Sequence, residues 1–329
     1  MVRAPLAVSL GDPAGIGAEV IAKSWERRSA EALPPFFAVG DIAAVRAVWD
    51  GPIASVEDPA EAIGRFNDAL PVIAVANFGA TPGTPDLVGA RTSLDSLELA
   101  VGLTRSGAAS GVVTGPVSKA QLYAVGFVHP GQTEFVAERC GVAGDLVAMM
   151  LAGPTLRVIP VTTHIPLAAV ASSLTIERIV SKGRAAIRGL QRQFGIGSPR
   201  IAVAGLNPHA GEGGAIGREE IEIISPAIER LREEGAEVSG PYPPDIMFND
   251  RHRRSYDAAL CMYHDQGLIP LKTLHFDEGI NVTLGLPIVR TSPDHGTAFD
   301  IAGKNLAHPD AMIAAIRTAG SSAARLAAA

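Results

Sequence analysis

The sequence predicts an α/β protein with a largely parallel sheet and helices on both faces of that sheet. Short, continuously apolar segments alternate with longer amphipathic ones along the 329 residues. This alternation is typical of parallel strands that are covered on both sides. The segments with the length and apolarity of buried strands are 5–10, 36–40, 71–76, 111–114, 156–163, 201–206, 258–263 and 280–284.

Helices are predicted between these strands. The clearest covers residues 175–194, where Thr175 can cap the first turn, apolar side chains recur on one face, and Gly195 can end the helix. A second helix is expected after Arg218, because the glutamates that follow it would lie near the positive end of the helix dipole.

The composition narrows the class of protein. Apolar residues make up 47%, charged residues 19%, and the net charge of −6 includes no block of like charge, so nucleic acid is not an expected partner. The two cysteines, Cys140 and Cys261, are far apart, which excludes a disulfide scaffold. No segment reaches the roughly 18 apolar residues of a membrane span, and too few residues precede the first strand for a signal peptide. We therefore expect a cytoplasmic enzyme.

Three of the eight histidines follow predicted strands. They are His164, His209 and His264. Ligands of open α/β sheets bind beyond the carboxyl ends of the strands, and three histidines with open positions are the usual form of a catalytic metal centre. Taken singly, each histidine more often caps a strand or binds a loop carbonyl, and their spacing matches no short metal-binding motif.

Two segments that follow strands have the residues of turns or anion sites. The glycines of residues 11–19 fit neither the dinucleotide-binding nor the P-loop pattern, so a tight turn is favoured there. In residues 114–119, Thr114, Ser118 and Lys119 could bind an anion, or Ser118 could simply begin a helix.

The densest group of polar residues lies between Lys272 and Lys304, in a region rich in glycine. Arg290 offers a planar guanidinium suited to a carboxylate or a phosphate. A surface salt bridge is the alternative for this arginine.

In their order along the chain, these segments closely resemble the 4-hydroxythreonine-4-phosphate dehydrogenase family of pyridoxal phosphate biosynthesis. The resemblance covers nearly the whole chain, and the last two motifs are long enough to be highly specific. The matching motifs are residues 11–17, 114–119, 163–167, 206–214, 240–245, 263–272 and 279–297.

The resemblance implies two α/β/α domains of the isopropylmalate dehydrogenase type, with an active-site cleft between them. The expected domains are residues 1–125 with 290–329, on the NAD side, and residues 126–289, on the metal and dimer side. The family also implies a homodimer with a shared active site. Its cofactors would be NAD, or NADP, and a divalent metal: zinc first, with magnesium, cobalt and manganese as alternatives.

Site residues carry over position by position. The family's metal ligands match His164, His209 and His264. Its substrate contacts match Thr133, Lys272, Asn281 and Arg290. Residues 294–304 are similar to the adenine-side loop of the decarboxylating dehydrogenases, which implies cofactor contacts at His295 and Asp300. Asp245 and Asp265 are candidates for the base that takes the hydroxyl proton.

One position departs from the family. Members usually read Pro-Gly-His-Thr-Glu where residues 130–134 read Pro-Gly-Gln-Thr-Glu. Gln132 can donate a hydrogen bond to a phosphate but cannot carry a charge, which weakens such a contact. More distant relatives, which act on dicarboxylated dihydrodiols, tend to lose this element. The retained Gly131, Thr133 and Glu134 therefore favour a phosphorylated substrate.

The expected reaction is the NAD- and metal-dependent oxidation of 4-phosphonooxy-L-threonine, with decarboxylation, to 3-amino-2-oxopropyl phosphate. A related substrate, threonate or erythronate 4-phosphate, is the first alternative. A metal-dependent phosphate-ester hydrolase would also suit three histidines, but it has no need of the loop at residues 294–304.

Overall fold

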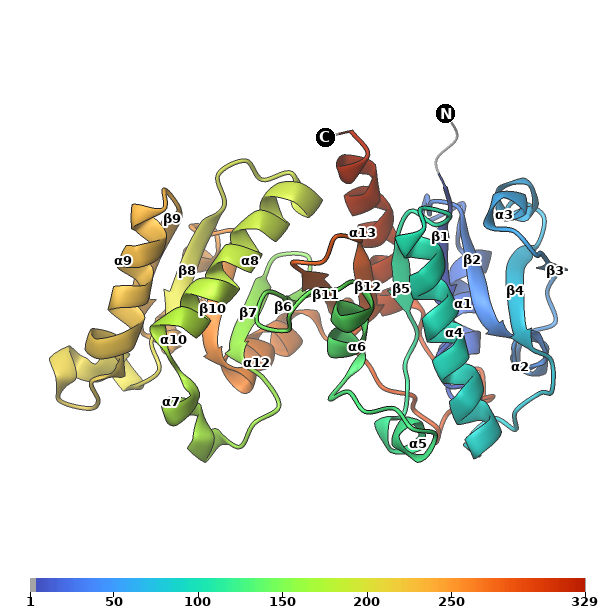
Figure 1. Cartoon of the computed structure of the whole chain (residues 1–329), viewed down its shortest axis with the longest axis horizontal. Coiled ribbons are helices and arrows are strands. Elements are labelled where there is room, and N and C mark those ends of the chain that lie inside the picture. Colours follow the sequence, from blue (N-terminus) through green and yellow to red (C-terminus); the bar gives the residue numbers. More distant parts are fainter. Residues whose placement is uncertain (1–3, 329) are drawn as a thin grey trace. The chain divides into compact units, whose positions relative to one another are not determined.

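The computed structural model describes residues 4–328, which form two compact units (Figure 1). Unit 1 comprises Met1–Gly141 and Pro287–Ala329, and unit 2 comprises Val142–Leu286. Within the described residues, every helix is too short or too polar to cross a membrane.

Unit 1 is built on a parallel sheet with the strand order β3-β4-β2-β1-β5-β12. Its strands are β1 (Leu6–Ser9), β2 (Phe36–Asp41), β3 (Ile53–Ser55), β4 (Leu70–Ala76), β5 (Val112–Thr114) and β12 (Arg290–Pro293). Its helices are α1 (Gly17–Glu26), α2 (Ile42–Val48), α3 (Pro59–Arg65), α4 (Leu87–Arg105), α5 (Lys119–Ala124), α6 (Gln132–Arg139) and α13 (Asp310–Leu326).

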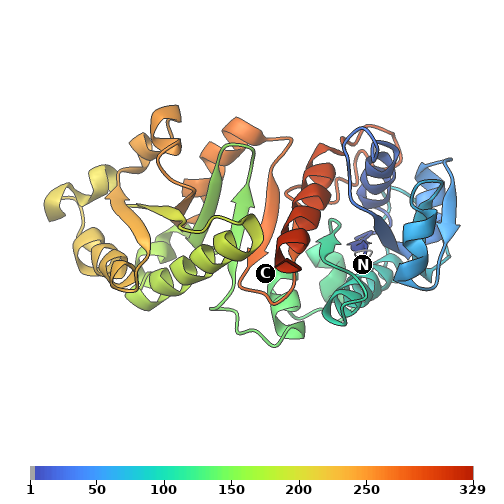
Figure 2. The same ribbon diagram turned by 90° about the horizontal axis from the view of Figure 1, so that it is seen from above.

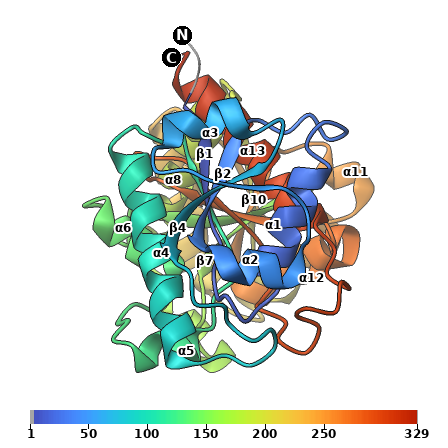
Figure 3. The same ribbon diagram turned by 90° about the vertical axis from the view of Figure 1, so that its right-hand side faces the viewer.

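Helices cover both faces of this sheet. Figure 3 shows α4 on one side of the strands and α1 on the other. The face under α4 buries Phe37, Val39 and Val112 of the strands together with Ala100 of the helix. On the opposite face, α1 packs beside α2 and α13.

Unit 2 contains a mixed sheet with the order β11-β6-β7-β10-β8-β9, in which β6 runs antiparallel to both of its neighbours. Its strands are β6 (Ala148–Ala152), β7 (Arg157–Thr162), β8 (Arg200–Ala204), β9 (Glu237–Tyr242), β10 (Ala258–Tyr263) and β11 (Ile280–Leu284). Its helices are η1 (Leu167–Ala169), α7 (Val170–Ser173), α8 (Ile176–Phe194), η2 (Pro208–Gly214), η3 (Glu220–Ile224), α9 (Ser225–Glu233), α10 (Pro244–Met247), α11 (Asp250–Arg253) and α12 (His264–His275).

The long helices of unit 2 lie on opposite sides of its strands, α8 on one side and α12 on the other (Figure 2). The α12 face buries Leu268 and Leu271 against Val158 and Cys261 of β7 and β10. This packing fixes the start of α12 at the carboxyl end of β10.

The structure confirms the predicted α/β class and the eight predicted strands. It adds β3, β6, β9 and β12. The last two escaped the prediction because β9 (Glu-Val-Ser-Gly-Pro-Tyr) and β12 (Arg-Thr-Ser-Pro) carry few apolar residues. The polar side chains of β12 are nevertheless buried.

The predicted helix at 175–194 is α8. Thr175 Oγ1 accepts a hydrogen bond from the Arg178 backbone N–H at 3.1 Å, and Gly195 ends the helix with φ = 70°. The helix expected after Arg218 begins with the π-helical turn η3 and continues as α9.

The division between the units differs from the predicted domain boundaries of 125/126 and 289/290. The helix α6 belongs to unit 1, so the first division falls after Gly141, and the second precedes Pro287. The physical reason lies in the contacts of α6. Arg139 Nε donates to both carboxylate oxygens of Glu98 in α4, and Phe135 packs on Phe127 with ring centroids 5.6 Å apart.

Candidate functional site

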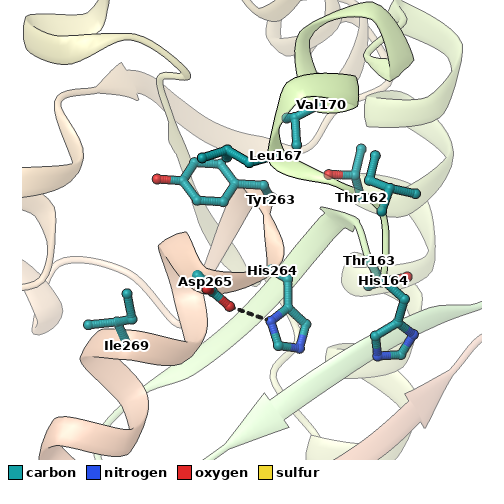
Figure 4. A pocket seen from close by; sticks show the side chains of 10 residues that line it. Thr162, Thr163, His164, Leu167, Val170, Tyr263, His264, Asp265 and Ile269 are labelled. Atoms are coloured by element: carbon teal, nitrogen blue, oxygen red, sulfur yellow. Dashed lines mark hydrogen bonds and ion pairs between the residues drawn. The ribbon is translucent and has the colours of Figure 1, made fainter.

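A pair of histidines lies at the carboxyl ends of two neighbouring strands in unit 2. His164 follows β7, and His264 is the first residue of α12, directly after β10. These parallel strands are in register, with Thr162 opposite Tyr263. The two imidazole centroids are therefore only 5.6 Å apart, and Figure 4 shows the two side chains next to each other. Sheet pairing thus brings together two histidines that are 100 positions apart in the sequence.

A cavity of about 390 Å³ adjoins this pair. It is lined by both imidazoles, by Asp265 and by apolar side chains that include Leu167, Val170 and Ile269 (Figure 4). A mostly apolar wall beside a few polar groups is the usual composition of a small-molecule site.

Asp265 orients the second imidazole. Its Oδ1 lies 2.7 Å from His264 Nδ1 (Figure 4). A carboxylate on Nδ1 fixes the tautomer that leaves the Nε2 lone pair for a metal ion. Asp265 was predicted as a candidate base, and in the structure its carboxylate is hydrogen-bonded to the His264 imidazole.

His209 lies in the loop after β8 and has the same local arrangement. Its Nδ1 is 3.0 Å from Glu212 Oε2, which again leaves Nε2 as the ligand atom. The donor chemistry of His209 and His264 therefore fits a divalent metal. Within residues 4–328, no group of three or more His, Cys, Asp or Glu side chains is close enough to hold a metal ion. The structure brings His164 and His264 together and leaves His209 outside that pair.

Gln266, a polar neighbour of His264 in the sequence, links the start of α12 to the beginning of the loop that carries His209, and sequence reasoning did not predict this link. Its side chain is buried. The Oε1 atom accepts from the Met262 backbone N–H at 2.6 Å, and Nε2 donates to the Gly205 carbonyl at 2.7 Å. The one available signal was its position two residues after His264.

A buried arginine forms the second cluster, in unit 1. Arg290 begins β12 and is only 3% exposed. Its Nη2 donates to Thr114 Oγ1 at 2.7 Å and to Gln132 Oε1 at 3.3 Å, and its Nη1 donates to Thr133 Oγ1 at 3.5 Å. These three acceptors are uncharged. Because Arg290 is buried, the alternative of a salt bridge on the surface is wrong for this residue.

Burial acts on the charge of this arginine. Desolvation lowers the pKa of Arg290 to about 10, although the nearby Glu134 favours the charged form. The guanidinium still carries its charge at neutral pH. A buried cation among hydroxyl groups is chemically suited to a phosphate or a carboxylate.

Both polar atoms of the Gln132 side chain form hydrogen bonds within unit 1. Its Nε2 donates to the Gly115 carbonyl at 3.1 Å, while its Oε1 accepts from Arg290. Of the alternatives for residues 114–119, the structure supports the helix start: Ser118 Oγ accepts from the Gln121 backbone N–H at 3.4 Å and caps α5. Thr114 instead contacts Arg290.

The remaining predicted residues are spread over both units. Lys272 lies on α12 two turns after His264 and shares a second cavity with it. Asn281 lies on β11, and within the described residues its Oδ1 is buried without a hydrogen-bond partner. Asp245 is exposed on α10.

His295 and Asp300 lie in the segment between β12 and α13, within unit 1. This segment contacts the glycine-rich turn after β1, because the Ile16 backbone N–H donates to the Thr297 carbonyl at 3.0 Å. The turn itself is tightly packed: a Cβ on Gly17 would lie 2.0 Å from the Leu10 carbonyl oxygen. This close approach accounts for the glycine and supports the predicted tight turn.

Comparison with known proteins gives consistent matches. The family model described as pyridoxal phosphate biosynthetic protein PdxA matches residues 34–319. A 4-hydroxythreonine-4-phosphate dehydrogenase from Zymomonas mobilis is 54% identical over 320 residues, which cover 97% of this chain and 96% of the relative.

Solved structures agree with these matches. The crystal structure of 4-hydroxythreonine-4-phosphate dehydrogenase from Klebsiella pneumoniae is similar with a TM-score of 0.86 and 38% identity, covering 98% of this chain and 100% of that one. A terephthalate 1,2-cis-dihydrodiol dehydrogenase from Burkholderia xenovorans is similar with a TM-score of 0.66 and 30% identity, covering 97% and 99% of the two chains.

Proposed function

The chain belongs to the PdxA family of pyridoxal phosphate biosynthetic proteins, and from this membership we propose its reaction. The names of its relatives support an oxidoreductase. We propose that it oxidises 4-phosphonooxy-L-threonine with NAD, or NADP, and a divalent metal. Loss of carbon dioxide would then give 3-amino-2-oxopropyl phosphate.

The buried cluster around Arg290 is the observation that best supports a phosphorylated substrate. A guanidinium that stays charged while 97% of its surface is covered presents a strong donor for an anion. Thr133 adds a hydroxyl beside it. We propose that Arg290, Thr133 and Gln132 bind the phosphate, and that Lys272 and Asn281 contact the rest of the substrate. The orphaned Oδ1 of Asn281 supports its role, because buried acceptors are rarely left unpaired.

The histidine pair supports the metal dependence. We propose that His164, His209 and His264 hold the metal through Nε2 atoms, with zinc first and magnesium, cobalt or manganese as alternatives. A divalent metal supplies Lewis-acid polarisation of the substrate hydroxyl. Asp265 would keep His264 in the metal-binding tautomer, because it already contacts Nδ1.

Two carboxylates are proposed for the proton transfer from the substrate hydroxyl. Asp245 is exposed on α10, so it can pass a proton to water. If Asp265 accepted the proton, it would weaken its hydrogen bond to His264. Asp245 is therefore the base that disturbs the histidine pair less.

The cofactor and the assembly complete the proposal. The nicotinamide accepts the hydride, which is chemistry of the cofactor itself. We place its adenosine part near His295 and Asp300. We also propose a cytoplasmic homodimer; the dimer is suggested by large apolar side chains that α12 exposes, Ile269 and Leu274, which a partner subunit could cover.

The direct test is to incubate the purified protein with NAD, a divalent metal and 4-phosphonooxy-L-threonine, while NADH is followed by absorbance. Parallel reactions would contain threonate 4-phosphate and erythronate 4-phosphate, because Gln132 replaces the family histidine. NADH formation is expected, fastest with the threonine derivative. Release of inorganic phosphate without NADH would replace this proposal with the hydrolase.

A further inference from the structure

The loop that carries His209 has an unusual backbone. Five consecutive residues, His209 to Gly213, have positive φ values between 46° and 80°. Three of them, His209, Ala210 and Glu212, are not glycine. L-residues avoid successive left-handed conformations because the Cβ crowds the carbonyl oxygen that follows it. Such a run persists where the surrounding structure holds it in place.

Glu220 provides that support from the other side of the loop. It is the first residue of the π-helical turn η3, and it is 3% exposed. Its Oε1 accepts from the backbone N–H groups of Leu206 and Asn207 at 2.8 and 2.7 Å, and its Oε2 accepts from Asn207 Nδ2 at 2.9 Å. All three donors belong to the two residues directly before Pro208.

The same carboxylate packs closely against the turn itself. A Cβ on Gly211 would lie 2.7 Å from Glu220 Oε2, and a Cβ on Gly205 would lie 3.1 Å from Oε1. Gly211, whose φ is 80°, therefore has no room for a side chain while the carboxylate stays in place, and Gly205 leaves the carboxylate a closer approach than most side chains would allow. The arrangement fixes where the loop leaves β8 and where its left-handed turn passes, and His209 lies between these two points.

We propose that Glu220 is a positioning residue that holds the His209 loop in the conformation required for metal binding. This inference rests on the proposed role of His209 as a metal ligand. The role requires a carboxylate, because all three partners are N–H donors and a carboxylate only accepts. In Glu220→Gln, one of the two oxygens becomes an NH₂ group. This NH₂ group would face either the NH₂ group of Asn207 or the two backbone N–H groups, so that one donor would oppose another.

The test compares Glu220→Gln with Glu222→Gln. Glu222 lies on the same π-helical turn but is exposed and pairs with Arg218, so it is a matched control. The first measurement is the Kd for Zn²⁺ alone, by competition with a chelator. Glu220→Gln should bind Zn²⁺ about 10- to 100-fold more weakly, as for other residues that orient metal ligands, and Glu222→Gln should match the wild type.

Hydrogen exchange in the metal-free protein gives a second measurement that does not depend on activity. The amides of Leu206 and Asn207 should exchange faster in Glu220→Gln than in the control. At saturating Zn²⁺, kcat should recover with the KM for the phosphorylated substrate unchanged, whereas general unfolding would not be rescued. Equal Zn²⁺ affinity in both variants would overturn the inference.

Three further outcomes are possible. If Glu220→Gln does not fold, Asn207→Ala keeps both backbone contacts of Glu220 and removes the hydrogen bonds from Asn207 Nδ2 to Glu220 Oε2 and to Glu219 Oε2; it should weaken Zn²⁺ binding measurably, and wild-type affinity would overturn the inference. If the wild type forms NADH while Glu220→Gln binds Zn²⁺ normally, the inference fails and the proposed function stands. If Glu220→Gln binds Zn²⁺ weakly but the wild type forms no NADH, the proposed function fails instead.

Discussion

Replacement of Arg290 by methionine should remove activity while it leaves stability nearly unchanged. Arg290 is 3% exposed, and burial lowers its pKa to about 10. This shift corresponds to roughly 3 kcal/mol that the fold loses by keeping the charge buried. Of its hydrogen bonds, only the one to Thr114 is short, at 2.7 Å, while those to Gln132 and Thr133 are long, at 3.3 and 3.5 Å, so the three together return about 3 kcal/mol. The two contributions nearly cancel, so Arg290→Met should change the free energy of unfolding by no more than about 1 kcal/mol.

The effect on catalysis should be much larger. A charged hydrogen bond contributes about 1.5–3 kcal/mol, and a guanidinium can make two of them to one phosphate. A loss of at least about 3 kcal/mol lowers kcat/KM by at least about a hundredfold. Urea denaturation and NADH formation would measure the two quantities on the same preparations. Unfolding that is easier by more than about 2 kcal/mol, together with an unchanged kcat/KM, would show that Arg290 is structural and does not bind phosphate.

The pKa of Arg290 also predicts how stability depends on pH. Because the folded pKa is lower than the unfolded one, the unfolded chain binds more protons at pH values between them. The wild type should therefore gain stability relative to Arg290→Met as the pH rises above about 10. A difference between the two proteins that stays constant through this range would contradict the burial argument.

Three further changes test other parts of the molecule. His264→Ala should weaken Zn²⁺ binding at least tenfold and abolish turnover, whereas the exposed His308→Ala should change neither; equal Zn²⁺ affinity in the two variants would remove His264 from the site. Gln132→His should lower the KM for the phosphorylated substrate if Gln132 is a weakened phosphate contact, and an unchanged KM would mean that Gln132 serves only to hold Arg290. Asp257→Asn should lower the free energy of unfolding by about 1 kcal/mol at pH 7. Burial raises the pKa of Asp257, but the hydrogen bonds from Arg200 outweigh burial and lower the pKa overall. The difference in stability between the two proteins should therefore disappear as the pH falls through the lowered pKa of the folded state.

Local signals predicted much of the fold. Apolar segments marked the buried strands, and Thr175 with Gly195 marked both ends of α8, because caps depend on residues adjacent in the chain. The same reasoning missed β9 and β12, whose side chains are polar. Such strands are stabilised by pairing with distant segments and by buried hydrogen bonds, which no local pattern records.

For the candidate site, too, the sequence indicated some features and the tertiary structure added others. The sequence by itself indicated the family through its long motifs and named the candidate residues, namely three histidines after strands and an arginine suited to phosphate. Only the tertiary structure decided that His164 and His264 are neighbours, that Arg290 is buried among hydroxyl groups, and that Glu220 and Gln266 both form hydrogen bonds to the loop after β8, which carries His209. The physical reason is that strand order and burial arise from contacts between residues far apart in the chain, so a glutamate that looks like any other helix residue becomes a loop anchor only once β8, η3 and β10 have folded together.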